Sequence, residues 1–576
     1  MKLSPTQSLA GVLEPVFAMR TEADLGIGDT EGVRQMIDWC ARHRLNILQT
    51  LPINELSDDN SPYNAISSLA IEPATIAITP ATVPDLAPER FLALAPPGLL
   101  AELREGPVNY PKVKALKRRL LEAAFENFDQ KHSGQETERG QQFRSFLKAN
   151  EDWLSDYALF RVLMEENGGS PAWNRWVPEH HSRASARKWL QSLPEQRRDE
   201  LKRKQTFFMY VQWLAFDQWQ ALKAYGTLKQ VNLMGDIPIG VGRASADVWA
   251  NRAIFDLDWS GGAPPEKAFK VDPFTEKWGQ NWGIPGYRWE VLRRRGFDWW
   301  RTRVGNIQKV FHLYRIDHVL GFFRIYSFPW TPDRNAEFLP LTEAQAAEKT
   351  GGRLPGFKQY PDDTPEHKAA NQAQGEEILR VVLEASGETT VVAEDLGVVP
   401  EYVHPTLQKL GVPGFRIPMF FRDHGGRYSD PKHYPRLSLA QPTTHDHPPL
   451  AAAWDECWQN IDAGKGVEAN RYELRAMMEF AGLGASEPPR QFSGQLQEGF
   501  TRAVLGSSSW LVVFQITDMF AMTARFNTPG SVAAANWSYR LPRTVKELDE
   551  DPALLQQTQM FSRLAQESGR GSGVEM

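Results

Sequence analysis

The sequence predicts an α/β fold in which short parallel strands and helices alternate around a barrel. Several short apolar runs end in polar or acidic residues, as buried parallel strands with functional groups at their C-terminal ends do. Helical patterns lie between some of these runs. An open doubly wound sheet would alternate in the same way. However, the sequence has no glycine-rich phosphate loop, and GIGD at 26–29 is neither a GxGxxG nor a Walker motif.

Seven apolar runs are candidate strands. The active sites of (β/α) barrels lie at the C-terminal rim, so the polar residues that end these runs are candidate site residues. The runs are 46–53, 231–239, 312–319, 389–397, 415–421, 442–446 and 510–520, and the last of them carries Asp518.

Three segments are predicted helices. Residues 32–43 place Val33, Met36, Ile37 and Cys40 on one face, with Asp29 or Thr30 as the N-cap. Helical composition also predicts helices at 209–226 and 376–387, and each is followed by a strand run.

A chain of 576 residues is long enough for one large domain with insertions or for several domains. We expect a single catalytic barrel domain over residues 1–565. The strand spacing is uneven and predicts a mostly helical insertion at about 80–205, an excursion over the rim at about 332–375 and a helical insertion at about 447–505. Residues 566–576 are expected to form a disordered tail.

Composition excludes several classes of function. A net charge of −6 without a strongly basic tract argues against nucleic-acid binding. No run approaches the ~18 apolar residues of a membrane helix, and the N-terminus lacks a signal-peptide pattern. The two cysteines, Cys40 and Cys457, cannot form a disulfide framework, so a cytoplasmic protein is expected. Most of the 19 Trp and 30 Phe residues are expected in the core, but some are candidate platforms for sugar rings.

Three carboxylates at different strand ends can converge on one site: Asp317, Glu394 and Asp446. A single acid of this kind is more often part of a surface ion pair. Three of them, each beside His, Arg or another acid, favour a shared site. Cleavage of a glycosidic bond needs one carboxylate that attacks the anomeric carbon and one carboxyl that protonates the leaving oxygen.

Ten motifs resemble, in order, the amylomaltase or disproportionating-enzyme family, the 4-α-glucanotransferases of glycoside hydrolase family 77. The resemblance implies a (β/α)8 TIM barrel of the α-amylase type with helical insertion subdomains and no C-terminal β domain, the eighth strand being expected in or near 67–78. The motifs are LGIGD (25–29), SPYNAISSLAIEP (61–73), WLSDYALF (153–160), GDIPIGV (235–241) with SADVWA (245–250), GQNWGIPGYRW (279–289), YRIDHVLGFF (314–323), AEDLG (393–397), GVPGFRI (411–417), THD (444–446) and NTPGSVAAANWSYR (527–540).

The resemblance also implies roles for individual residues. Asp317 would be the nucleophile, Glu394 the general acid/base and Asp446 the transition-state stabiliser. Arg315 would lie on the same strand face as Asp317 and keep it ionised. The other implied substrate-binding residues are Ser61, Tyr63, Asp236, Trp282, His318, Asp395 and His445.

The implied reaction is transfer of α-1,4-glucan segments between maltooligosaccharides, with glucose as an acceptor and without metal or cofactor. A monomer or a homodimer is expected. The main rival is a metal-dependent hydrolase, because His445 and His447 flank Asp446 as zinc ligands can. In such a hydrolase the HxH motif would lie on the first strand, whereas here it lies on a late one. The other strand ends also offer few histidines as further metal ligands. A plain glucan hydrolase and a non-catalytic glucan-binding scaffold are the remaining alternatives.

The sequence departs from the family pattern at His447, Ile71, Glu72 and the 266–278 loop. These positions are expected to touch the glucan site, so they leave acceptor preference open. His447 would face away from the site or lie on a loop.

Overall fold

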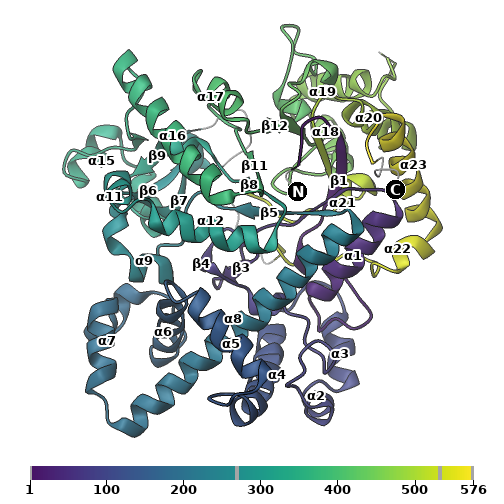
Figure 1. Ribbon diagram of the computed structural model, residues 1–576. Coiled ribbons are helices and arrows are strands. Elements are labelled where there is room, and N and C mark those ends of the chain that lie inside the picture. Colours follow the sequence, from purple (N-terminus) through teal and green to yellow (C-terminus); the bar gives the residue numbers. More distant parts are fainter. Residues whose placement is uncertain (1–2, 266–271, 485, 530–534, 572–576) are drawn as a thin grey trace.

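A computed structural model describes residues 3–265, 272–484, 486–529 and 535–571. Its centre is a closed barrel of eight parallel strands, which confirms the predicted fold (Figure 1). The strand order around the barrel is β1 (Leu9–Leu13), β14 (Leu511–Gln515), β13 (Ser438–Ala440), β12 (Gly414–Arg416), β11 (Thr390–Ala393), β8 (Leu313–Ile316), β5 (Asn232–Ile237) and β2 (Ile47–Gln49).

Two strands differ from the sequence prediction. The eighth barrel strand is β1, whose apolar run is interrupted by Gly11. A Cβ at Gly11 would lie 2.1 Å from the carbonyl oxygen of Ile47, so the close approach of β1 to β2 requires glycine there. The segment 67–78, where the eighth strand was expected, instead enters β4 (Ala65–Ile71), which pairs antiparallel with β3 (Asn54–Leu56). The other difference is β13, which ends before the predicted run 442–446.

Helices cover the outside of the barrel as the amphipathic patterns predict. In α1 (Thr30–Arg42) the residues Val33, Met36, Ile37 and Cys40 are buried, and the N-cap is Asp29, whose carboxylate accepts from the backbone of Glu31. The other long helices around the barrel include α8 (Glu195–Lys229), α12 (Asp298–Val310), α16 (Pro365–Ser386), α17 (Val403–Leu410) and α23 (Pro552–Glu567). The helix α8 begins 14 residues before the predicted start at 209.

A helical layer between β4 and β5 forms the lower part of Figure 1. Lys117 joins this layer to the barrel: its buried ammonium donates to the carbonyls of Ala74 and Ile76 and lies 3.5 Å from the carboxylate of Asp29. The helices of the layer are α2 (Pro88–Leu94), α3 (Pro97–Arg104), α4 (Tyr110–Lys131), α5 (Glu138–Ala149), α6 (Leu154–Glu166) and α7 (Arg183–Ser192).

The sequence did not predict a second sheet, which four strands from separate segments form. Its antiparallel order is β10 (Gly356–Lys358), β9 (Ile325–Phe328), β6 (Phe255–Ala263) and β7 (Gln280–Tyr287). A small separate core lies beside it, made of Phe274, Trp278, Phe328, Trp330, Phe338 and Ala346. The predicted excursion at 332–375 contains α14 (Asn335–Phe338), α15 (Glu343–Lys349), β10 and the start of α16.

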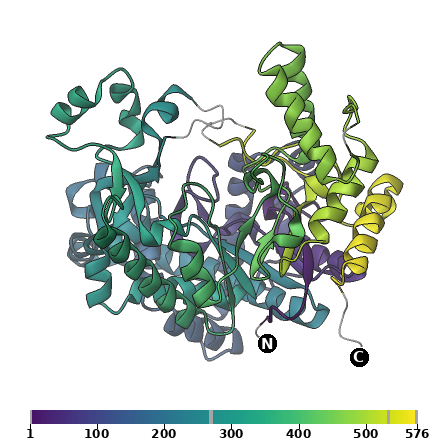
Figure 2. The same cartoon turned by 90° about the horizontal axis from the view of Figure 1, so that it is seen from above.

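Helices α18 (Leu450–Asp462), α19 (Val467–Phe480) and α20 (Gly494–Leu505) follow β13. Figure 2 shows α18 and α19 rising on the opposite side of the molecule from α14 and α15. After β14 the described residues form helices and loops but no further strand, with α21 (Ile516–Met519) and α22 (Glu547–Glu550) before α23. Within the described residues, none of the helices has the length and apolarity needed to span a membrane.

The C-terminal segment differs from the expected disordered tail over its described part. Helix α23 continues to Glu567, and Arg570 is 1% exposed. Its guanidinium donates to the carbonyls of Leu9, Leu505 and Trp510, among others, at the N-terminal end of β1 and β14. A buried cation with several acceptors holds this segment in place. Residues 572–576 lie outside the described part of the chain.

Glu14 is a fully buried acid directly after β1. Neither carboxyl oxygen has a hydrogen-bond partner among the described residues. Burial raises the pKa of Glu14 to about 8, because the charged form loses its hydration. The folded protein therefore holds a proton there at pH values at which the unfolded chain has released it.

Stability should therefore fall between pH 5.5 and 7.5 through Glu14. The folded pKa lies above the unfolded value, so the folded state loses stability as pH rises through this window, by about 1.4 kcal/mol per pH unit. Glu14→Gln removes the titrating carboxyl and, with it, this dependence of stability on pH. We expect the free energy of unfolding of Glu14→Gln, relative to wild type, to rise by about 2–3 kcal/mol between the two pH values in urea titrations. The exposed Glu22→Gln is the control, and equal pH dependence of all three proteins would contradict the prediction.

Candidate active site

The C-terminal ends of β5, β8 and β11 bring four of the predicted residues to one part of the rim. Asp236 in β5 pairs in register with Arg315 in β8. Asp317 follows β8 and Glu394 follows β11. Because neighbouring parallel strands end at the same edge, acids far apart in the sequence become neighbours here.

Arg315 lies between two carboxylates. Its Nη1 donates to Oδ2 of Asp236 at 2.5 Å, and its Nη2 donates to Oδ1 of Asp317. The guanidinium is buried, and Asp236 is 1% exposed. Burial raises the pKa of Asp236 to about 6, against the opposing effect of Arg315. The fixed cation orients the Asp317 carboxylate and offsets the repulsion between the two acids.

Glu394 is held as a proton-bearing acid. Its carboxyl oxygens accept from the backbone N–H groups of His318 and Leu396, both at 2.7 Å. Burial, opposed by Arg315 and reinforced by Asp317, raises the pKa of Glu394 to about 8. A carboxyl group that keeps its proton at neutral pH can act as a general acid.

Asp446 has the opposite electrostatic environment. Burial raises its pKa, but His445 and Asn527 outweigh this effect and hold the pKa well below its usual range. Nε2 of His445 lies 3.3 Å from Oδ2 of Asp446, and Nδ2 of Asn527 donates to Oδ1 at 2.7 Å. Asp446 therefore stays ionised and can stabilise positive charge.

Tyr63 connects the Asp236–Arg315–Asp317 group with the His445–Asp446 group. Its hydroxyl donates to Asp236 at 2.7 Å and accepts from Arg315 at 3.2 Å. Its ring stacks on His445, with centroids 5.2 Å apart and an interplanar angle of 8°. The Asp236–Arg315–Asp317 group and the His445–Asp446 group thus belong to one site.

Three more of the predicted binding residues, Trp282, Ser61 and His318, lie next to these groups. The indole of Trp282 is 38% exposed and meets the ring of His318 edge to face, with centroids 5.0 Å apart. Ser61 lies on the loop before Tyr63, and its Oγ accepts from the Tyr63 backbone at 3.3 Å. Burial lowers the pKa of His318 to about 4, so its imidazole is neutral.

Asp395 makes its contacts behind the strand ends. Its carboxylate is 2% exposed, accepts from the backbone N–H of Phe415 at 2.6 Å and lies 3.1 Å from Nε2 of His404. A Cβ at Gly414 would approach this carboxylate to 2.3 Å, so glycine leaves the space it needs. These contacts join β11 to β12, and among the described residues Asp395 forms no hydrogen bond or ion pair with Asp317, Glu394 or Asp446.

His447 turns back on its own loop. Its Nδ1 shares a hydrogen bond of 2.7 Å with Oγ1 of Thr444, and its ring meets Phe420. Among the described residues there is no cluster of three His, Cys, Asp or Glu side chains that could hold a metal ion.

The other departures from the family pattern are Glu72, Ile71 and the 266–278 loop. The carboxylate of Glu72 accepts from the backbone of Leu56 and Ala74, so it stabilises the turn after β4. The backbone of Ile71 is paired with the side chain of Gln212. Residues 266–271 of the 266–278 loop lie outside the described part, and the rest contributes α10 (Pro273–Trp278).

Two further residues of the site, Asn527 and Trp537, were not predicted from the sequence. Asn527 contacts Asp446 directly, and the indole of Trp537 lies 5.9 Å from the Tyr63 ring and 6.1 Å from the His445 ring. Both belong to the motif 527–540, but the sequence alone gave no partner for either.

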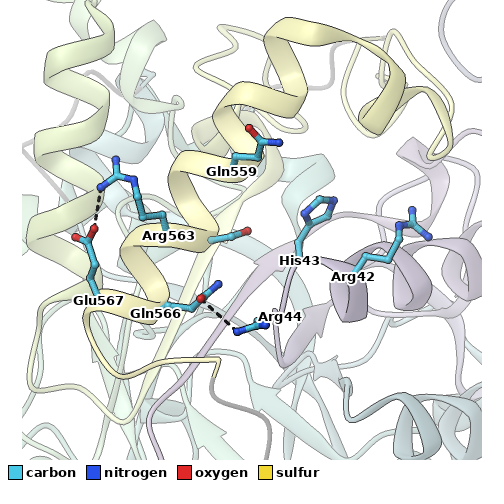
Figure 3. Close-up of a pocket in the computed structure, with 8 residues that line it drawn as sticks. Arg42, His43, Arg44, Gln559, Arg563, Gln566 and Glu567 are labelled. Atoms are coloured by element: carbon cyan, nitrogen blue, oxygen red, sulfur yellow. Dashed lines mark hydrogen bonds and ion pairs between the residues drawn. The ribbon is translucent and has the colours of Figure 1, made fainter.

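A surface hollow of about 350 Å³ lies at the other end of the barrel, between the C-terminus of α1 and α23 (Figure 3). Arg42 and His43 pair with Asp549, and Arg563 pairs with Glu567 and Glu498. Because these charges are already paired, the hollow offers little unused binding chemistry.

Comparison with known proteins relates most of the chain to enzymes of glucan transfer. A family profile described as 4-alpha-glucanotransferase matches residues 14–546. The 4-alpha-glucanotransferase of Chlamydia caviae is 30% identical over 551 residues, covering 93% of this chain and 91% of the relative. That of Thermus thermophilus is 31% identical over 501 residues, covering 86% and 87%.

Solved structures support the fold. An amylomaltase from Streptococcus agalactiae in complex with acarbose superposes with a TM-score of 0.74 at 22% identity, covering 98% of this chain and all of that one. An amylomaltase from Corynebacterium glutamicum gives a TM-score of 0.75 at 22% identity, covering 97% of this chain and 75% of that one.

The site predicts a separable titration of Glu394. In wild type, the carboxyl of Glu394 should titrate near pH 8, and Asp317→Asn should lower its pKa because a neighbouring negative charge is removed. The measurement is ¹³C NMR of protein labelled at glutamate carboxyl carbons, with Glu394→Gln identifying the signal. A Glu394 signal that titrates near the ordinary glutamate value would contradict the assigned environment.

Proposed function

The chain belongs to glycoside hydrolase family 77, the 4-alpha-glucanotransferases, and from this premise we propose that Asp317, Glu394 and Asp446 carry out glucan transfer by a retaining double displacement. The substrates are α-1,4-glucans and maltooligosaccharides, with glucose as an acceptor. The observation that carries the proposal is the electrostatic contrast at one rim: Glu394 keeps its proton near neutral pH, whereas Asp446 is held ionised.

The first half of the reaction forms a covalent intermediate. The Asp317 carboxylate, oriented by Arg315, attacks C1 of the donor sugar. The bond from C1 to the glycosidic oxygen breaks, and Glu394 gives its proton to that oxygen. The donor's reducing-end fragment leaves, and the remaining glucan is bound to Asp317 as an ester.

The second half transfers this glucan to an acceptor. Glu394, now a carboxylate, takes the proton of the acceptor's 4-OH, and the oxygen attacks C1. The ester bond to Asp317 breaks and both acids return to their starting states. Asp446 stabilises the oxocarbenium-like charge in both halves, and two inversions at C1 give net retention.

Aromatic and polar side chains around the acids would bind the sugar rings. The exposed indole of Trp282 offers an apolar face for an acceptor ring, and Tyr63 presents its ring beside His445. Both cysteines are free and buried, which fits a reducing compartment such as the cytoplasm. A monomer or a homodimer remains our prediction for the assembly.

Maltotriose tests the activity and the nucleophile together. Wild type, incubated without added metal or cofactor, should produce glucose and a ladder of longer maltooligosaccharides by chromatography and mass spectrometry. Asp317→Asn should produce neither, because the attacking carboxylate is lost. Glucose and maltose without longer products would instead identify a hydrolase, and a ladder formed by Asp317→Asn would reject the assigned nucleophile.

Trp282→Ala tests the acceptor platform. Loss of the stacking face should raise the KM for acceptor glucose by about tenfold, which corresponds to about 1.4 kcal/mol, and leave kcat nearly unchanged. Transfer rates at varied glucose and fixed donor concentration measure this effect. Trp259→Ala, on the neighbouring strand β6, is the matched control, and equal KM values for wild type and Trp282→Ala would remove Trp282 from the acceptor site.

A further inference from the structure

The loop that presents Asp446 is held from outside itself. Residues 443–450 form most of the connection from β13 to the first residue of α18, and Asp446 lies near their middle. Asp518 lies in α21, directly after the neighbouring strand β14, and is 2% exposed. The sequence singled out Asp518 as an acid near a strand end, yet the proposed chemistry gives it no step.

Asp518 binds both ends of this loop. Oγ1 of Thr443 donates to its Oδ2 at 2.5 Å, and the backbone N–H of Leu450 donates to its Oδ1 at 2.7 Å. The two anchors lie on either side of Asp446 in the sequence. One carboxylate with two acceptor oxygens thus fixes the distance between the start and the end of the loop.

Gln515 gives these hydrogen bonds a direction. Its Nε2 donates to Oγ1 of Thr443 at 2.5 Å and to the carbonyl of Thr444 at 2.7 Å. Because Oγ1 of Thr443 receives this proton, its own hydroxyl proton points to Asp518. The buried chain Gln515–Thr443–Asp518 is therefore ordered in one sense and links the end of β14 to the backbone beside His445.

We propose that Asp518 is a positioning residue for glucan transfer, which holds the loop 443–450 so that Asp446 faces the anomeric carbon. The inference rests on the proposed function, because it acts through Asp446. Burial raises the pKa of Asp518 to about 7, because its surroundings disfavour the charged form. Two convergent donors from one loop account for a carboxylate at this position.

This role differs from general stabilisation of the fold. A displaced stabilising carboxylate weakens binding of the transition state but leaves the contacts with the ground-state sugar. Loss of the hydrogen bonds from Thr443 and Leu450 to Asp518 should therefore lower kcat and leave KM nearly unchanged. A protein that was only partly folded would lose active enzyme in proportion to its unfolded fraction.

Three variants of the full-length protein test whether Asp518 holds the loop 443–450: Asp518→Asn, Thr443→Val and Thr443→Ser. Asn at 518 replaces one acceptor oxygen by a donor, Val at 443 removes the hydroxyl at similar size, and Ser retains the hydroxyl. With maltotriose as the substrate, we expect kcat to fall by about tenfold to a hundredfold in Asp518→Asn and Thr443→Val, with KM within about twofold of wild type. Thr443→Ser should stay close to wild type.

Thermal unfolding and Asp446→Asn complete the experiment. Wild-type kcat in both Asp518→Asn and Thr443→Val, together with an inactive Asp446→Asn, would overturn the positioning role and leave the proposed function intact. A fall in kcat that only matches the unfolded fraction would also overturn it. Full activity of Asp446→Asn would overturn both the role of Asp446 and the inference that depends on it.

Discussion

The arrangement of the site depends on one buried cation. Arg315 lies in β8, with Asp236 beside it in β5 and Asp317 two residues further along the chain, directly after β8. Without the guanidinium, these two acids and Glu394 would repel one another in a poorly hydrated place. Removal of a buried partner of this kind leaves uncompensated charge, which is among the costliest changes a protein can undergo.

The barrel places Glu394 and Asp446 in opposite electrostatic environments. Glu394 lies in a dry position where backbone N–H groups fix its orientation, and burial keeps its proton in place. Asp446 lies on a loop where His445 and Asn527 favour the charged form. Tyr63 joins the two environments by stacking on His445 and donating to Asp236. In the proposed reaction, proton donation and charge stabilisation therefore belong to different carboxyl groups.

The elements that the sequence predicted well are those whose signal is local. Strands β5, β8 and β11 are short apolar runs that end in acids, and α1 has its apolar residues at helical spacing. The strand β1 was missed because Gly11 weakens the pattern while serving a close contact with β2. The sheet formed by β10, β9, β6 and β7 was missed because its strands are joined by long connections instead of tight turns, and strand pairing leaves little trace in a single segment.

The sequence by itself predicted a barrel, three candidate catalytic acids at strand ends and, through its motifs, the family. Strand-end acids and helical periodicity are properties of neighbouring residues, so they can be read along the chain. Only the tertiary structure decided that Arg315 bridges Asp236 and Asp317, that Asp395 faces the joint between β11 and β12, and that Asn527 supports Asp446. The protonation state and orientation of a side chain depend on burial and on partners from distant segments, and chain folding alone brings those partners together.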